Sequence, residues 1–165
     1  MLLNFKSEKS YQSTNEIIKK HNIVSNSSTT NELLEDEINF NEWKLEIPKI
    51  NLVANISEGT SKEILNNYIG HFEETKKDIG NIGLAAHNRG YQVNYFEKLK
   101  DLKEGDYIYY TYKETKRTYV IISRLIIKDT EWSNLENTED NRLTLITCVE
   151  NKPKLRRCVQ AIEVK

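Results

Sequence analysis

Apolar and polar residues alternate over much of the chain after residue 42, which is the pattern of half-buried β-strands. WKLEIPKI and NLVANI predict two strands near an edge or a bend, because Pro48 interrupts the first of them. NIGLAAHN predicts a buried strand of small residues that ends at His87. DYIYYTYK and RTYVIISRLIIKD predict two long strands separated by the KETK turn. In LTLITCVENKPKLRRCVQAIEV, residues 143–164, two further β-branched runs flank a short polar turn.

Only two short segments of this region have helical spacing. SKEILNNYI, with Ser61 as its N-cap, predicts one helix, and VNYFEKLKDL predicts another that stops before Gly105. Seven or eight strands with so few helices indicate a mainly β fold. We expect a closed or nearly closed β-barrel with short helical insertions.

Residues 1–42 differ from the rest, since they are polar, rich in Asn and Ser, and only weakly periodic. Ser13 or Thr14 can cap a helix that runs to about Lys20, and NELLEDE predicts a second helix beyond the linker-like SNSSTT. We therefore expect an N-terminal helical and linker arm over residues 1–42, followed by one barrel domain over residues 43–165.

Composition narrows the possible partners. The 165 residues suit one domain, and 24 basic against 25 acidic residues leave a net charge of −1, which argues against a nucleic-acid partner. No apolar run approaches the roughly 18 residues that cross a bilayer, and MLLNFKSEKS is too short for a signal peptide.

The cysteines and histidines suggest reactivity rather than metal binding or a disulfide scaffold. Two cysteines, Cys148 and Cys158, allow one disulfide bridge at most. The sequence contains no C-x-x-C pattern, and its three histidines form no H-x-x-x-H pattern, so the usual spacings of zinc ligands are missing. We expect neither a metal site nor a cofactor. A nucleophilic thiol needs a base nearby, and His87 at a strand end among small residues is the best candidate, with His71 second.

The final hairpin brings an arginine to the thiol. A three-residue turn, Asn151 to Pro153, would place Cys148 opposite Arg156, whereas a two-residue turn would place Leu155 or Arg157 there. An arginine beside a nucleophilic sulfur can bind the oxyanion formed when a carbonyl is attacked. A plainer interpretation remains for each piece, since a strand cysteine is often a core residue and KPKLRR often a solvated hairpin tip. We assign no role to Cys158.

Three separated motifs in this chain resemble the sortase family. TLITC at 144–148, followed by RRCVQA, is similar to the sortase signature of Thr-Leu-x-Thr-Cys and a downstream strand arginine. LEIPKINL at 45–52 resembles the opening strands of sortases, and NIGLAAHNRG at 81–90 resembles the strand that carries the family histidine. The resemblance covers about residues 43–165, and the order His, Cys, Arg differs from papain-like proteases, where the cysteine comes first.

The resemblance implies an eight-stranded sortase-type β-barrel and a cysteine transpeptidase of Gram-positive bacteria. Such enzymes cleave a Leu-Pro-x-Thr-Gly-like sorting signal of secreted proteins between Thr and Gly, then pass the acyl group to an amine of a peptidoglycan precursor or a pilin lysine. By motif, Cys148 would be the nucleophile and His87 the general acid. Family arginines stand five residues before a small residue of the last strand, and counting back from Ala161 gives Arg156, with Arg157 as the fallback.

Two more residues carry expected roles near the peptide. Thr147 is expected either to supply a hydroxyl or backbone donor near the oxyanion or simply to stabilise its strand, and Ala86, with Ala85, to shape the peptide groove. No Asp-Pro-Trp or Asp-Pro-Phe lid precedes the barrel, which favours a housekeeping-like or class B/D-like sortase over the pilus-building class.

The family also implies a location on the extracellular face of the membrane through an N-terminal transmembrane anchor, of which MLLNFK would be the trimmed end. The alternatives are a sortase-fold cysteine hydrolase and a non-catalytic β-barrel that binds peptide or cell wall.

Overall fold

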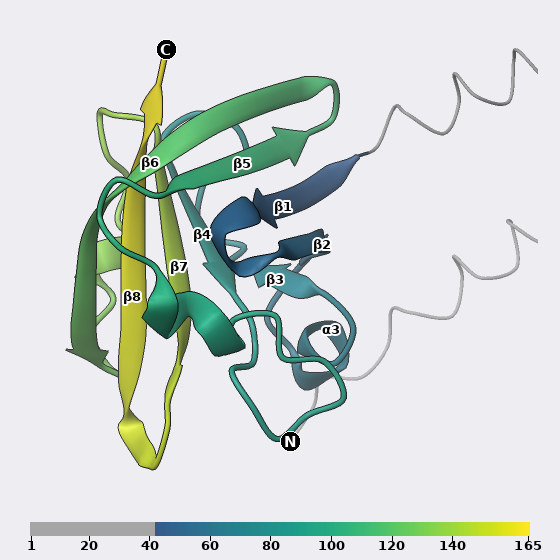
Figure 1. Cartoon of the computed structure of the whole chain (residues 1–165), viewed down its shortest axis with the longest axis vertical. Helices are drawn as coiled ribbons and strands as arrows, with labels where there is room; N and C mark the ends of the chain where they lie inside the picture. Colours follow the sequence, from purple (N-terminus) through teal and green to yellow (C-terminus); the bar gives the residue numbers. More distant parts are fainter. Residues whose placement is uncertain (1–41) are drawn as a thin grey trace, which may run out of the picture. The chain divides into compact units, whose positions relative to one another are not determined.

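Residues 42–165 form a closed barrel of eight strands with short helical segments between them, as the computed structural model describes them (Figure 1). The predicted mainly β barrel is confirmed. The N-terminal arm expected over residues 1–42 lies outside the described residues, apart from Glu42. In chain order the elements are β1 (Trp43–Ile47), η1 (Pro48–Ile50), β2 (Leu52–Glu58), α3 (Lys62–Leu65), β3 (Ile69–His71), β4 (Asn81–Ala85), η2 (Glu97–Asp101), β5 (Tyr107–Tyr112), β6 (Thr115–Lys128), η3 (Ser133–Leu135), β7 (Arg142–Val149) and β8 (Lys152–Val164).

The strand order around the barrel is β1-β2-β3-β4-β7-β8-β6-β5, and β5 pairs with β1 to close it. Two pairs are parallel, β2 with β3 and β4 with β7, and the others are antiparallel. The β4–β7 pair joins segments about 60 residues apart in the sequence. Because the two strands run in the same direction, their carboxyl ends lie at the same end of the barrel, where the β7–β8 hairpin projects (Figure 1).

Alternation along the strands decides which side chains enter the core. On β4, β7 and β8, every second residue belongs to the buried core cluster, namely Ile82, Leu84, Leu143, Leu145, Val159 and Ala161. The residues between them point to the opposite face, since successive side chains of a strand alternate. Several of these are buried as well, among them Asn81, Thr144, Cys158 and Gln160, so both faces of this part of the sheet are covered.

Three local details differ from the sequence-based predictions. SKEILNNYI is helical only over α3, and its last residues begin β3, a strand of three fully buried residues with no alternation to reveal it. VNYFEKLKDL forms only the short η2 rather than an α-helix. The turn after β5 lies at Lys113 and Glu114, so that β6 already begins at Thr115.

Candidate active site

Strand pairing brings three of the predicted residues into one row across β4, β7 and β8. The parallel ladder ends with Ala85 opposite Ile146, and one residue later the Ala86 amide donates to the Ile146 carbonyl at 3.4 Å. Two residues further along both chains lie His87 and Cys148. On the other side of β7, Cys148 is paired with Arg156 of β8.

Cys148 and Arg156 project from the outer face of the barrel, since Leu145 of β7 and Val159 of β8 belong to the core cluster and alternation turns these two side chains the other way. His87 lies two residues beyond β4 and directly follows Ala86, which belongs to the core cluster. The row therefore joins a thiol, an imidazole and a guanidinium from segments that lie far apart in the sequence.

The hairpin reaches this register through a two-residue turn and a bulge. Val149 is paired with Lys152, so the turn contains only Glu150 and Asn151, and the ladder then shifts before it resumes at Cys148 and Arg156. The three residues between Lys152 and Arg156 have no counterpart on β7. The sequence had left both turn lengths open; the shorter one forms, and because of the bulge in β8 it still pairs Cys148 with Arg156 rather than with Leu155 or Arg157.

The bulge also orients the arginine. Nη1 of Arg156 donates to the Pro153 carbonyl at 2.7 Å and to the Leu155 carbonyl at 2.8 Å. Its other guanidinium nitrogens have no hydrogen-bond partner within residues 42–165, so they remain available to an anion.

Arg157 is paired with Thr147 and with Ile126, and alternation places its side chain on the opposite face from that of Cys148.

The two thiols have opposite environments. Cys148 is exposed, whereas Cys158 is completely buried, and this burial raises the pKa of the Cys158 thiol to about 12. A thiol with so high a pKa is almost entirely protonated at neutral pH and is a poor nucleophile. Only Cys148 has the accessibility that nucleophilic chemistry requires.

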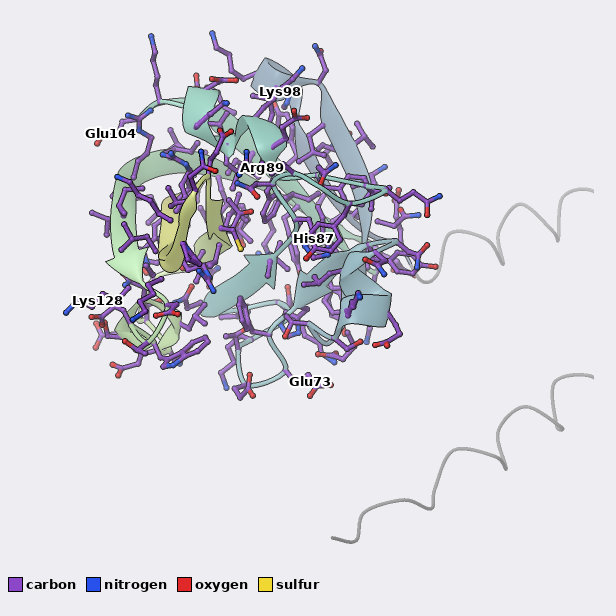
Figure 2. All side chains as sticks on the ribbon, turned by 90° about the horizontal axis from the view of Figure 1, so that it is seen from below. Glu73, His87, Arg89, Lys98, Glu104 and Lys128 are labelled. Carbon is purple, nitrogen blue, oxygen red and sulfur yellow. The ribbon has the colours of Figure 1, made fainter. Side chains whose placement is uncertain are left out.

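His87 is half-buried at the end of β4 and lies near the middle of the end view in Figure 2. Burial lowers its pKa below the ordinary value near 6.5, and the positive charge of Lys62 lowers it further. Nε2 of His87 is buried and has no hydrogen-bond partner in the described part of the chain. The Tyr91 ring stacks on the imidazole, with ring centroids 3.5 Å apart and planes inclined by 5°. Sequence reasoning missed Tyr91, because only the fold of the following loop returns it to His87.

His71, the second candidate base, lies elsewhere. It is fully buried on β3, which is not a neighbour of β7, and its Nδ1 is 2.7 Å from Oε1 of Glu58. Nε2 lies 2.9 Å from the Lys76 carbonyl. Both ring nitrogens therefore serve internal hydrogen bonds that join β2, β3 and the loop before β4.

Thr147 and Ala86 form a structural link between β7 and β4. The Thr147 hydroxyl donates to the Ala86 carbonyl at 2.7 Å, and both residues are buried. This geometry does not support the expected donor role for the hydroxyl, which is already engaged. Nor does it support a groove contact by the Ala86 side chain, which lies in the core, whereas Ala85 is half-buried on the outer face.

Within residues 42–165 no group of three or more His, Cys, Asp or Glu side chains is arranged to hold a metal ion. No helix in this described range is both long and apolar enough to span a membrane.

The chain is similar to known proteins that share one family description. A family model described as a sortase domain matches residues 45–164. The chain is 29% identical over 119 residues to Sortase A of Bacillus anthracis, covering 72% of this chain and 57% of that protein. It is 32% identical over 119 residues to Sortase D of Bacillus subtilis, covering 67% of this chain and 58% of that protein. The chain thus spans less than two thirds of the length of these curated relatives.

Solved structures show the same architecture. Sortase A of Listeria monocytogenes superposes with a TM-score of 0.70 at 26% identity, covering 76% of this chain and 88% of that one. Sortase C1 of Streptococcus suis gives a TM-score of 0.71 at 23% identity, covering 99% and 90%, and this second likeness concerns the fold alone.

Proposed function

The chain belongs to the sortase family, and we propose that it is a cysteine transpeptidase with Cys148 as nucleophile, His87 as general acid and base, and Arg156 as charge stabiliser. The row formed by these three residues across β4, β7 and β8 carries the proposal. Residues 43–165 are then the catalytic domain.

In the acylation step, the Cys148 thiolate attacks the carbonyl carbon of the scissile peptide bond. Negative charge develops on the carbonyl oxygen, and the free donors of Arg156 stabilise it, since preorganised donors aimed at a developing oxyanion are a large catalytic effect. The carbon–nitrogen bond then breaks, and imidazolium at His87 gives its proton to the departing amine. The product is a thioester on Cys148.

In the second step an amine attacks the thioester carbonyl. His87, now neutral, takes a proton from the attacking nitrogen, the carbon–sulfur bond breaks, and a new amide forms as the thiolate returns. Water can replace the amine and would give hydrolysis. Because burial lowers the pKa of His87, the imidazolium that the first step needs is a minority species at neutral pH.

The substrate follows from the family. We propose that the donor is a secreted protein with a Leu-Pro-x-Thr-Gly-like sorting signal, cut between Thr and Gly, and that the acceptor amine belongs to a peptidoglycan precursor or a pilin lysine. We further propose that the domain acts at the extracellular face of a Gram-positive cell membrane, held by an N-terminal anchor. We propose a housekeeping-like or class B/D-like enzyme.

The test is to incubate the protein with a Leu-Pro-x-Thr-Gly peptide, with and without a glycine-based amine or a lysine side-chain amine. Mass spectrometry should detect an acyl adduct on the wild type and on Cys158→Ala, but none on Cys148→Ala. The amine should divert product from the free acid to the ligated peptide. Product that ignores the amine would identify a hydrolase, and the absence of an adduct on the wild type would favour a non-catalytic binding barrel.

A further inference from the structure

Among the described residues, 42–165, no side chain gives the imidazole of His87 the orienting hydrogen bond that a catalytic base usually receives from a third group. Its Nε2 has no hydrogen-bond partner within residues 42–165. The contact that defines the plane of the ring is the stack with Tyr91, at 3.5 Å and 5°. The orientation of His87 therefore depends on the loop that carries Tyr91.

This loop, residues 88–95, is held by its own hydrogen bonds. The Tyr91 amide donates to Oδ1 of Asn94 at 3.2 Å, and Nδ2 of Asn94 donates back to the Tyr91 carbonyl at 2.8 Å. The amide of Phe96, which follows the loop, donates to the His87 carbonyl at 3.0 Å. Gly90, with φ of +78°, supplies the left-handed residue that turns the chain back over the histidine.

The same loop is fastened to the β7–β8 hairpin next to the nucleophile. Nδ2 of Asn88 donates to the Cys148 carbonyl at 2.9 Å. Arg89 reaches the hairpin turn, where Nη1 contacts Oε1 of Glu150 at 2.5 Å and Nη2 donates to Oδ1 of Asn151 at 2.7 Å. In the end view of Figure 2, Arg89 and His87 are both labelled near the middle of the molecule, whereas Glu73 and Lys128 are nearer its margin.

We propose that Arg89 and Tyr91 are positioning residues for the transpeptidation reaction: Arg89 couples the loop to the hairpin of Cys148, and Tyr91 fixes the imidazole of His87 by stacking. This inference rests on the proposed function. The proposal adds two residues to the site: Tyr91 acts through His87, and Arg89 acts through the loop and the hairpin that carries Cys148.

Because the ion pair between Arg89 and Glu150 is exposed, we infer that it positions the loop rather than stabilises the fold. The side chains of Arg89 and Glu150 are 50% and 54% exposed, and exposed ion pairs contribute little to folding free energy. The pair nevertheless joins the two segments that supply His87 and Cys148. A displacement of about 1 Å between reacting groups can cost about a hundredfold in rate.

The stack also suits the protonation state that the reaction needs. Two neutral rings avoid a face-to-face sandwich, whereas a cation is attracted to the face of a tyrosine ring. A parallel stack at 3.5 Å thus favours imidazolium over neutral imidazole, and it offsets part of the cost of charging a half-buried ring. Imidazolium is the form that protonates the leaving amine.

Arg89 is tested by a double-mutant cycle with Glu150. Arg89→Ala should lower kcat about tenfold and Glu150→Ala by less, because the contact of Arg89 with Asn151 remains in the latter; both should change KM less than about twofold and leave the melting temperature unchanged. The double variant should be no slower than Arg89→Ala, because the contact with Glu150 is already lost when Arg89 is removed. Lys116→Ala is the control. It breaks an ion pair between Lys116 at the start of β6 and Glu46 of β1, whose side chains are 53% and 22% exposed. This pair lies near the β5–β6 hairpin (Figure 1), so its loss should leave kcat unaltered. Additive losses, or an unchanged kcat in Arg89→Ala, would overturn the role of Arg89.

Tyr91 is tested by changing the ring. Tyr91→Phe keeps the aromatic face and should retain kcat within about twofold, whereas Tyr91→Leu should lose about tenfold and shift the acid limb of the pH–rate profile. Equal activity of the Leu and Phe variants would overturn the role of the stack.

A readout without substrate separates this inference from the proposed function. The NMR cross-peaks between the His87 and Tyr91 rings should be present in the wild type and weaken in Arg89→Ala, whether or not the protein turns over a sorting peptide. A wild type that forms no acyl adduct would refute the proposed function alone. Cross-peaks that are absent from the wild type, or undiminished in Arg89→Ala, would refute the coupling itself.

Discussion

Cys148 of β7 lies opposite Arg156 of β8 although the hairpin between them turns in only two residues. A regular ladder with this turn would place Pro153 opposite the thiol. Since proline has no N–H to donate to a ladder, the strand bulges at Pro153–Leu155, and pairing resumes at Arg156. The bulge thus brings a guanidinium to Cys148, and its own carbonyls hold that guanidinium in place.

Arg156→Ala should lower kcat/KM about 10²- to 10³-fold, because it removes a donor for the oxyanion. Circular dichroism should show an unaltered fold. Arg157→Ala is the matched control, since its side chain leaves from the opposite face of the same strand, and it should lose less than about threefold. A large loss in Arg157→Ala with a small one in Arg156→Ala would show that the arginine assignment is off by one residue.

Alkylation should distinguish the two cysteines. Iodoacetamide at pH 7.5 should add one carbamidomethyl group to the native protein, at the exposed Cys148, and two to the protein in 6 M guanidinium. Burial raises the pKa of Cys158 to about 12, so that thiol is both shielded and protonated. Peptide mapping by mass spectrometry provides the measurement, and native labelling at Cys158 would contradict it.

Lys62→Gln should raise the pKa of His87, because it removes a positive charge that disfavours imidazolium. The Hε1 resonance of His87, followed by NMR against pH, measures this directly. Lys113→Gln removes the same charge from the turn between β5 and β6, and it should leave the pKa of His87 unchanged. A downward or absent shift in Lys62→Gln would contradict the electrostatic contribution.

The same shift has a consequence for stability. The folded-state pKa of His87 lies below its unfolded value near 6.5, so the unfolded chain binds this proton more readily. The contribution to stability is present above pH 6.5 and is lost as the pH falls through the folded-state pKa. Urea unfolding between pH 7 and pH 5 should show a smaller loss in Lys62→Gln than in the wild type.

Thr147→Val should destabilise the fold by about 1–3 kcal/mol, because it leaves the buried Ala86 carbonyl without its donor while it preserves side-chain shape. Equilibrium urea denaturation gives the free energy of unfolding. Thr115→Val, at an exposed position where β6 begins, should change it by less than about 0.5 kcal/mol. Equal effects at the two positions would mean that the Thr147 hydroxyl bond adds nothing to stability.

Asn81→Ala should loosen the loop between β6 and β7. Asn81 is 1% exposed, and its Nδ2 donates to the carbonyls of Asn134 and Glu136 at 2.9 and 2.8 Å, while Oδ1 accepts from Thr144. Loss of these hydrogen bonds should lower the free energy of unfolding by about 2–3 kcal/mol. Hydrogen exchange should accelerate at residues 133–137 more than at β5, and uniform acceleration would instead indicate global destabilisation.

Local sequence signals were sufficient for most of the strands and for choosing three candidate residues that the structure aligns across neighbouring strands. The β-branched and aromatic runs of β5, β6, β7 and β8 are long enough to predict strands, although parts of β7 and β8 are buried on both faces. Where an element is short and buried on all sides, as in β3, no periodicity marks it, and the sequence-based prediction missed it.

The sequence by itself determined a barrel-forming pattern, a cysteine in one strand, a histidine at the end of another strand and an arginine pair past the hairpin. Only the tertiary structure decided how they meet: the parallel pairing of β4 with β7 brings His87 beside Cys148, the bulge in β8 chooses Arg156 over Arg157, and the returning loop lays Tyr91 on the imidazole. The physical reason is that these relationships depend on register, bulge placement and stacking between distant segments, and no pattern within any one segment contains them.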